Sequence, residues 1–160
     1  MLTQTRNNSG AVTHLRVAAC EQLSEPLTAI YCRTATQSEE AITAQKDFLM
    51  RYADNNGFIP CAAFIDDGES GAHINRPALQ DMLSGIESGC IKRVLISSFS
   101  RLCRDHLLTE KLLAYFGKHS IELIAVKDGF NSRDGDTVNP MFALSGLVSE
   151  MCGKQADNNI

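Results

Sequence analysis

Apolar and polar residues follow one another along this chain in blocks that switch between the period of a strand and the period of a helix. Short runs rich in strand-forming residues predict buried strands at 27–32, 58–65, 94–96 and 121–126. Between these runs, apolar residues recur at helical spacing and predict helices that end near Gly57, Gly89 and Gly117. A capping box at Thr36 and a cap at Asn75 would begin the first two helices.

Strands that alternate with helices predict a single three-layer α/β/α domain with a mostly parallel sheet of four to five strands. We expect this domain to occupy residues 27–152, with 153–160 as a tail and no separate DNA-binding domain. Residues 1–26 carry no sustained period, which predicts a poorly structured N-terminal extension.

A further helix is predicted to begin at Asn139-Pro140, near the end of the chain. Its apolar residues are spaced 3, 4 and 3 apart and form a one-sided stripe: Met141, Leu144, Val148 and Met151. Such a stripe packs either on its own domain or on a partner helix. Both interpretations stay open on the sequence alone.

Composition narrows the class of protein. The chain has 160 residues, 44% of them hydrophobic, and a net charge of −4, which argues against a protein that coats DNA by bulk charge. No apolar run is long enough to span a bilayer, and we expect a cytoplasmic protein. The six cysteines form no Cys-x-x-Cys pair and the four histidines show no metal-ligand spacing, so we expect free thiols and neither a metal nor a cofactor.

Polar residues that follow the predicted strands should meet at one edge of the sheet, because ligands of parallel sheets bind at the carboxyl ends of the strands. This edge would hold Arg33, Asp67, Ser70, Arg76, Arg101 and Arg104. The planar fork of arginine matches phosphate oxygens two at a time, so the cluster suits a phosphate. Surface arginines in solvated salt bridges with nearby acidic residues would give the same pattern.

Three motifs carry a family resemblance. They are Tyr31-Cys32-Arg33 followed by Gln45, the run 67–71 followed by Arg76-Pro77, and the run 100–105. With these motifs the chain from Ala29 to about Met151 resembles the catalytic domain of the resolvase/invertase family of serine site-specific recombinases. The resemblance implies DNA recombination, in the setting of mobile elements, by a serine that attacks a DNA phosphodiester without a metal.

By position, the resemblance implies that the phosphate is bound by Arg33, Arg76, Arg101 and Arg104, with Tyr31, Gln45, Asp67 and Ser70 as supporting residues. The position of the nucleophilic serine is occupied by Ala35. Alanine can neither attack phosphorus nor be activated by a base. We therefore expect a domain of recombinase lineage that is defective in cleavage and keeps weak affinity for DNA phosphates.

Neighbouring hydroxyls do not replace the serine on this interpretation, because Thr34 and Thr36 leave the strand toward other sides. Two other functions stay open. In one, the chain is a non-enzymatic regulatory partner that forms a heterodimer with an intact recombinase, or a homodimer, through the helix from Met141 to Met151. In the other, the acidic loop at 66–69 marks a metal-dependent receiver-like or phosphotransfer domain.

Overall fold

The computed structural model describes residues 3–6, 12–15 and 25–134. Four parallel strands form the centre of the sheet, in the order β4, β3, β5, β6. Their bounds are Cys61–Asp67 for β4, Leu27–Thr34 for β3, Ile91–Ile96 for β5 and Glu122–Ala125 for β6. The predicted fold class, α/β with a mostly parallel sheet, is confirmed.

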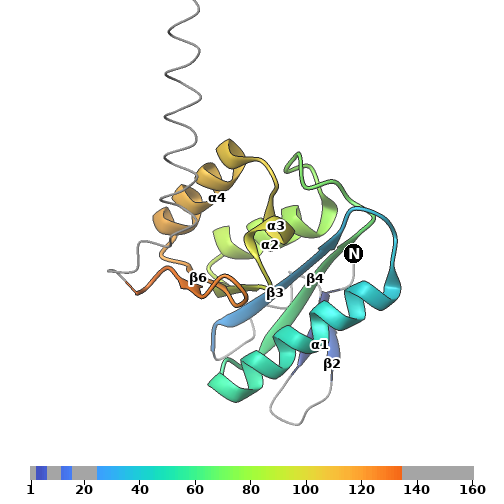
Figure 1. Ribbon diagram of the computed structural model, residues 1–160. Helices are drawn as coiled ribbons and strands as arrows, with labels where there is room; N and C mark the ends of the chain where they lie inside the picture. Colours follow the sequence, from blue (N-terminus) through green and yellow to red (C-terminus); the bar gives the residue numbers. More distant parts are fainter. Residues whose placement is uncertain (1–2, 7–11, 16–24, 135–160) are drawn as a thin grey trace, which may run out of the picture.

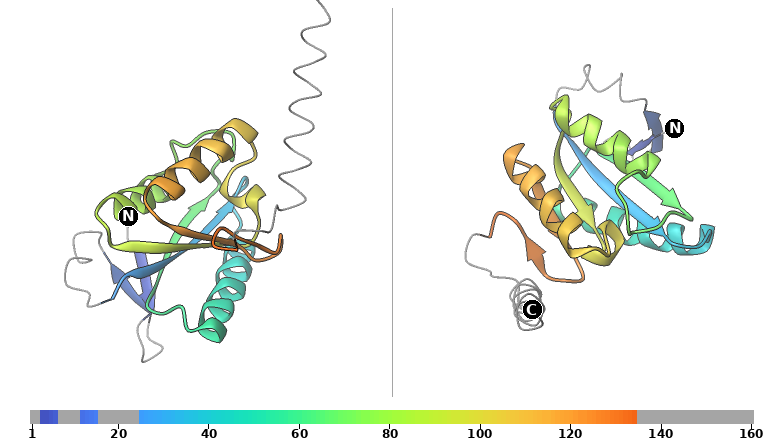
Figure 2. Two further views of the ribbon diagram at one scale, coloured as in Figure 1. Left: turned by 90° about the vertical axis from the view of Figure 1, so that its left-hand side faces the viewer. Right: turned by 90° about the horizontal axis from the view of Figure 1, so that it is seen from above.

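Helices cover both faces of this sheet (Figures 1 and 2). Helix α1 (Glu39–Asn56) packs on one face, where Ile30 and Cys32 of β3 join its Leu49 in a buried cluster. Helices α2 (Pro77–Glu87) and α4 (His106–Lys118) pack on the other face, over Tyr31 and its neighbours. A short helix that the sequence did not predict, α3 (Phe99–Leu102), follows β5.

Antiparallel strands extend the sheet at both ends. The short strand β7 (Phe130–Asn131) pairs with β6. At the other end β1 (Thr3–Arg6) pairs with β4, and β2 (Val12–Leu15) pairs with β1. Two segments of the predicted N-terminal extension thus pair into the sheet, although their sequences show no sustained period.

Helix starts differ from the predicted caps. Helix α1 is capped by Ser38, whose hydroxyl accepts a hydrogen bond from the Ala41 amide, and not by Thr36. Helix α2 begins after Arg76 instead of Asn75 and has no side-chain cap of its own. The predicted end of α1 is confirmed, because Gly57 adopts a left-handed conformation (φ 68°) that closes the helix.

The predicted helix 139–151 and the tail 153–160 lie outside the described residues and stay predictions. Within the described ranges, no helix is both long enough and apolar enough to cross a membrane.

Candidate functional site

The carboxyl ends of the parallel strands bring most of the predicted site residues together. Strand β3 ends with Arg33-Thr34 and is followed by the exposed Ala35. The loop after β4 reaches the residues after α3, because the Arg104 amide donates a hydrogen bond to the Gly71 carbonyl (3.1 Å). The site thus forms where β3, β4 and β5 end, at the rim predicted for a parallel sheet.

Arg33 is the most enclosed residue of this site, with 0% of its surface exposed. Its guanidinium donates three hydrogen bonds to backbone carbonyls: Nε to Arg101 (2.9 Å), one terminal nitrogen to Glu69 (2.8 Å) and the other to Ser100 (2.8 Å). These carbonyls lie 36 to 68 residues away along the chain. Arg33 therefore fastens the loop after β4 and helix α3 to the end of β3.

Burial and neighbouring positive charges both disfavour the charged form of the Arg33 guanidinium. Burial lowers the pKa of its guanidinium, and the neighbouring charges of Arg76, Arg104 and Arg101 lower it further. The three carbonyl dipoles offset this cost by accepting hydrogen bonds from the charged form. The positive charges of three other arginines of the predicted set thus act on Arg33.

Arg76 lies below the rim and is also 0% exposed. Its guanidinium donates to the carbonyls of His73 (2.9 Å) and Leu102 (2.6 Å) and to the hydroxyl of Tyr31 (2.8 Å). The Tyr31 hydroxyl in turn donates to Asp66 (2.8 Å). Burial raises the pKa of Tyr31 far above its usual value; Arg76 opposes the rise and Asp66 adds to it, so the phenol stays protonated and bridges the two charged groups.

Asp66 is the site residue that the sequence interpretation missed. It is 1% exposed, and besides Tyr31 its carboxylate accepts hydrogen bonds from the first amides of α2, at Ala78 (2.9 Å) and Leu79 (3.0 Å). An acid at this place satisfies free amides and complements the helix dipole. Strand alternation could have found it, because Ala62 and Phe64 of β4 face the same core and Asp66 continues their side.

The predicted Asp67 points to the other face of the sheet. Its carboxylate accepts hydrogen bonds from the Thr34 hydroxyl (2.6 Å) and the Ser38 amide (2.8 Å), and these bonds hold the pKa of Asp67 below its usual value. The Gln45 side chain accepts a hydrogen bond from the Arg33 amide (3.2 Å) and donates one to the Arg33 carbonyl (3.0 Å). Asp67 and Gln45 thus support the end of β3 and the start of α1.

The groups that a ligand could reach without rearrangement are fewer than the predicted set. Arg104 is exposed, Arg101 is half-buried, and Ser70 is exposed with its hydroxyl accepting from the Ala72 amide. Between described residues, the ion pairs join Glu122 to Arg93 and Arg133, and none ties a rim arginine to an acidic residue. Solvated salt bridges therefore do not account for the arginine cluster in the described part of the chain.

Two observations bear on the alternative of a metal-dependent domain. Asp66 and Asp67 are adjacent in sequence but are bonded to different partners on opposite faces of the sheet. In the ranges that the structure describes, no three side chains of His, Cys, Asp or Glu gather as metal ligands would. The acidic loop therefore gives this alternative no support.

Comparisons with known proteins agree with the geometry. Among solved structures, the chain is similar to the N-terminal catalytic domain of TP901-1 integrase, with 26% identity and a TM-score of 0.68, covering 84% of this chain and 99% of that one. It is also similar to a resolvase family site-specific recombinase from Streptococcus pneumoniae (24% identity, TM-score 0.65, 84% and 95% covered). The latter likeness shows the fold alone.

Sequence comparison gives two further matches. Over 64 residues the chain is 38% identical to the uncharacterized immunity region protein 3 of Bacillus phage phi105, which covers 38% of this chain and 78% of that protein. The sequence model of the family described as "Resolvase, N terminal domain" matches residues 28–159. This protein therefore belongs to the resolvase family and has the fold of its serine-recombinase catalytic domain.

Proposed function

We propose that this chain is a recombinase catalytic domain that binds DNA phosphates but does not cleave DNA. The observation that carries the proposal is Ala35, an exposed residue at the end of β3, immediately after the strand that holds Arg33. A methyl group stands where the family resemblance places the nucleophilic oxygen. Removing a nucleophile costs about a millionfold in rate in a serine hydrolase, where binding and electrostatics remain.

The hydroxyl of Thr34, the residue before Ala35, supports the same conclusion. Thr34 donates its hydroxyl proton to Asp67 at 2.6 Å and lies in the strand with its side chain buried. This hydroxyl is buried and donates to a carboxylate on the α1 side of the sheet, whereas the Arg33 guanidinium is bonded to α3 on the other side. Thr34 is therefore no substitute for the missing serine.

Phosphate binding is assigned to the arginines according to their exposure. Arg101 and Arg104 are the ones that solvent reaches, and they would contact a phosphodiester directly. Arg33 and Arg76 act behind them, since their guanidinium groups are bonded to carbonyls of α3, the helix that contains Arg101 and precedes Arg104. Binding of this kind releases counterions, so affinity for DNA should fall steeply as the salt concentration rises.

The test restores the missing oxygen. The native chain and its Ala35→Ser variant are incubated with a supercoiled plasmid that carries the DNA flanking the gene for this chain. A denaturing gel then reports covalent protein–DNA adducts. The matched control is Ala44→Ser, which makes the same chemical change at an exposed position of α1.

We expect an adduct from Ala35→Ser and none from the native chain or the control. A serine-linked adduct from the native chain would contradict the proposal. A variant that folds and still forms no adduct would show that more than the nucleophile has been lost from the site.

A second candidate function follows from the same residue. A subunit without a nucleophile that assembles with an intact recombinase would lower the number of strands that the assembly can cut. Titrating the native chain into an active recombinase of the same source should then reduce recombination and give a heterodimer on gel filtration. The Ala35→Ser variant should inhibit less, which separates this role from competition for DNA.

A further inference from the structure

Helix α3, which contains Arg101, is a single turn that depends on contacts with distant parts of the chain. It has four residues, too few for its own hydrogen bonds to fix it in place. Ser98 at its start makes no side-chain capping bond, and its hydroxyl lies instead 2.9 Å from that of Ser100. The carbonyls of Ser100 and Arg101 accept hydrogen bonds from the buried Arg33. The first amide of α3 therefore needs an acceptor from another segment.

Asp128, in the turn between β6 and β7, supplies this acceptor. Its carboxylate accepts a hydrogen bond from the Phe99 amide at 2.8 Å, 29 residues away along the chain. The ring of Phe130 meets the Phe99 ring edge-on, with 5.1 Å between the ring centroids. The Lys127 amide donates to the Ser97 carbonyl at 2.8 Å. The turn after β6 thus contacts the start of α3 through its backbone, a carboxylate and a ring.

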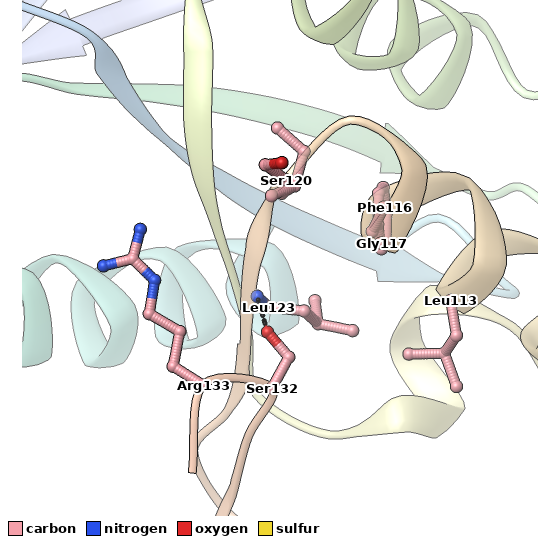
Figure 3. A pocket seen from close by; sticks show the side chains of 8 residues that line it. Leu113, Phe116, Gly117, Ser120, Leu123, Ser132 and Arg133 are labelled. Atoms are coloured by element: carbon pink, nitrogen blue, oxygen red, sulfur yellow. Dashed lines mark hydrogen bonds between the residues drawn. The ribbon is translucent and has the colours of Figure 1, made fainter. Parts of the chain in front are cut away.

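The base of the same hairpin is well bonded (Figure 3). The Ser132 hydroxyl accepts a hydrogen bond from the Leu123 amide, and the Ser132 amide donates to the Leu123 carbonyl, both at 2.9 Å. The Asn131 side chain donates to one carboxylate oxygen of Glu122 (3.1 Å). The other oxygen of Glu122 is paired with Arg93 of β5 at 2.7 Å. These bonds hold the hairpin to the sheet, so its turn can give α3 a fixed position.

We propose that Asp128 is a positioning residue for Arg101, because by fixing the start of α3 it holds the Arg101 guanidinium where that group meets a DNA phosphate. Two anchors then set the helix, with Arg33 on its carbonyls and Asp128 on its first amide. Asp128 carries a negative charge that repels phosphate, so it is not itself a ligand. The inference rests on the proposed binding of DNA phosphates, and it adds a residue that follows β6 to a site formed where β3, β4 and β5 end.

The sign of the change in DNA affinity tests this role. Asp128→Ala removes a negative charge near the rim, which by charge alone would tighten the binding of DNA. Positioning predicts the opposite, because the first amide of α3 loses its acceptor and the contact of Arg101 with the phosphate is lost. Asp128→Asn removes the same charge but keeps an oxygen that can accept from the Phe99 amide. The matched control is Asp47→Ala, which removes the same charge from an exposed position of α1.

Fluorescence anisotropy with a labelled DNA duplex at several salt concentrations gives the Kd and its salt dependence, and circular dichroism verifies that each variant is folded. We expect Asp128→Ala to raise the Kd about tenfold and to lower the slope of log Kd against log salt by about 1, which is the loss of one phosphate contact. Asp128→Asn and Asp47→Ala should bind at least as tightly as the native chain. In a chain that already carries Arg101→Ala, Asp128→Ala should weaken binding no further.

Binding by Asp128→Ala that is tighter than native or unchanged would overturn the positioning role. So would weakening that is the same with and without Arg101, or weakening by Asp128→Asn that equals that of Asp128→Ala. Arg101→Ala alone separates this failure from that of the proposed function. If this variant binds DNA as the native chain does, Arg101 contacts no phosphate and the proposed phosphate binding fails together with this inference. If it binds more weakly, a failure of the Asp128 variants overturns the positioning role alone.

Discussion

Removing the Asp66 carboxylate should destabilise the domain more than any other change to an acidic residue at the rim. In Asp66→Ala, the Tyr31 hydroxyl and the amides of Ala78 and Leu79 lose an acceptor that is 1% exposed. Hydrogen bonds to charged groups contribute about 1.5 to 3 kcal/mol each, and they are not additive. Breaking a buried charged network costs about 3 to 5 kcal/mol, which we expect as the loss in free energy of unfolding.

The assay is urea unfolding at neutral pH, followed by circular dichroism, together with a thermal melt. A domain of this size loses about 2 to 4 °C in Tm per kcal/mol, so the melting temperature should fall by about 10 °C. The control is Asp67→Ala, the neighbouring acid on the other face, which should cost less.

Tyr31→Phe tests the network itself, since it removes the hydroxyl that joins Asp66 to Arg76. In a double-mutant cycle the losses from Asp66→Ala and Tyr31→Phe should be less than additive, because both break one bond. Equal losses from Asp66→Ala and Asp67→Ala, or strictly additive losses in the cycle, would refute the role assigned to Asp66.

Three further changes test other parts of the site. Arg33→Lys keeps the charge but cannot reach three carbonyls at once, so urea unfolding should show a loss of about 2 to 4 kcal/mol. Gly71→Ala would place a Cβ 2.9 Å from a pinned Arg33 nitrogen and should cost about 1 to 3 kcal/mol, whereas Gly117→Ala, which meets nothing, should not destabilise. The pKa of Asp67 is lowered, so its contribution to the free energy of unfolding is present above its unfolded pKa of about 3.9 and is lost as the pH falls through its lower folded pKa. In Asp67→Asn, the free energy of unfolding should therefore fall less steeply as the pH is lowered through this range.

The sequence was most informative where a local signal and the tertiary structure agree. The buried strand at β3, the glycine that ends α1 and the alternation that makes the sheet parallel could all be predicted, because each depends on neighbouring residues. Strands β1 and β2 could not, since they are short and depend on pairing with β4. Their sequences carry no period of their own.

The site was predicted by residue type but not by contact. Arg33 and Arg76 were identified as phosphate ligands, yet in the structure they are bonded to carbonyls that lie far away in the chain. Local sequence does not reveal such partners. The predicted site contained Asp67 and not Asp66 for a simpler reason. Two adjacent acids look alike in sequence, and only the face of the strand on which each lies distinguishes them.

The carbonyl bonds of Arg33 have a consequence for how such sequences change over time. Arg33 holds the rim together through three carbonyl bonds, and the domain needs these bonds to fold whether or not any DNA is cut. Loss of Arg33 would free the loop after β4 and helix α3 at once, whereas Ala35 is an exposed residue beyond the end of β3. In this chain, the presence of Arg33 therefore reports on the folding of the rim, and the proposal that DNA is not cut depends on Ala35 alone.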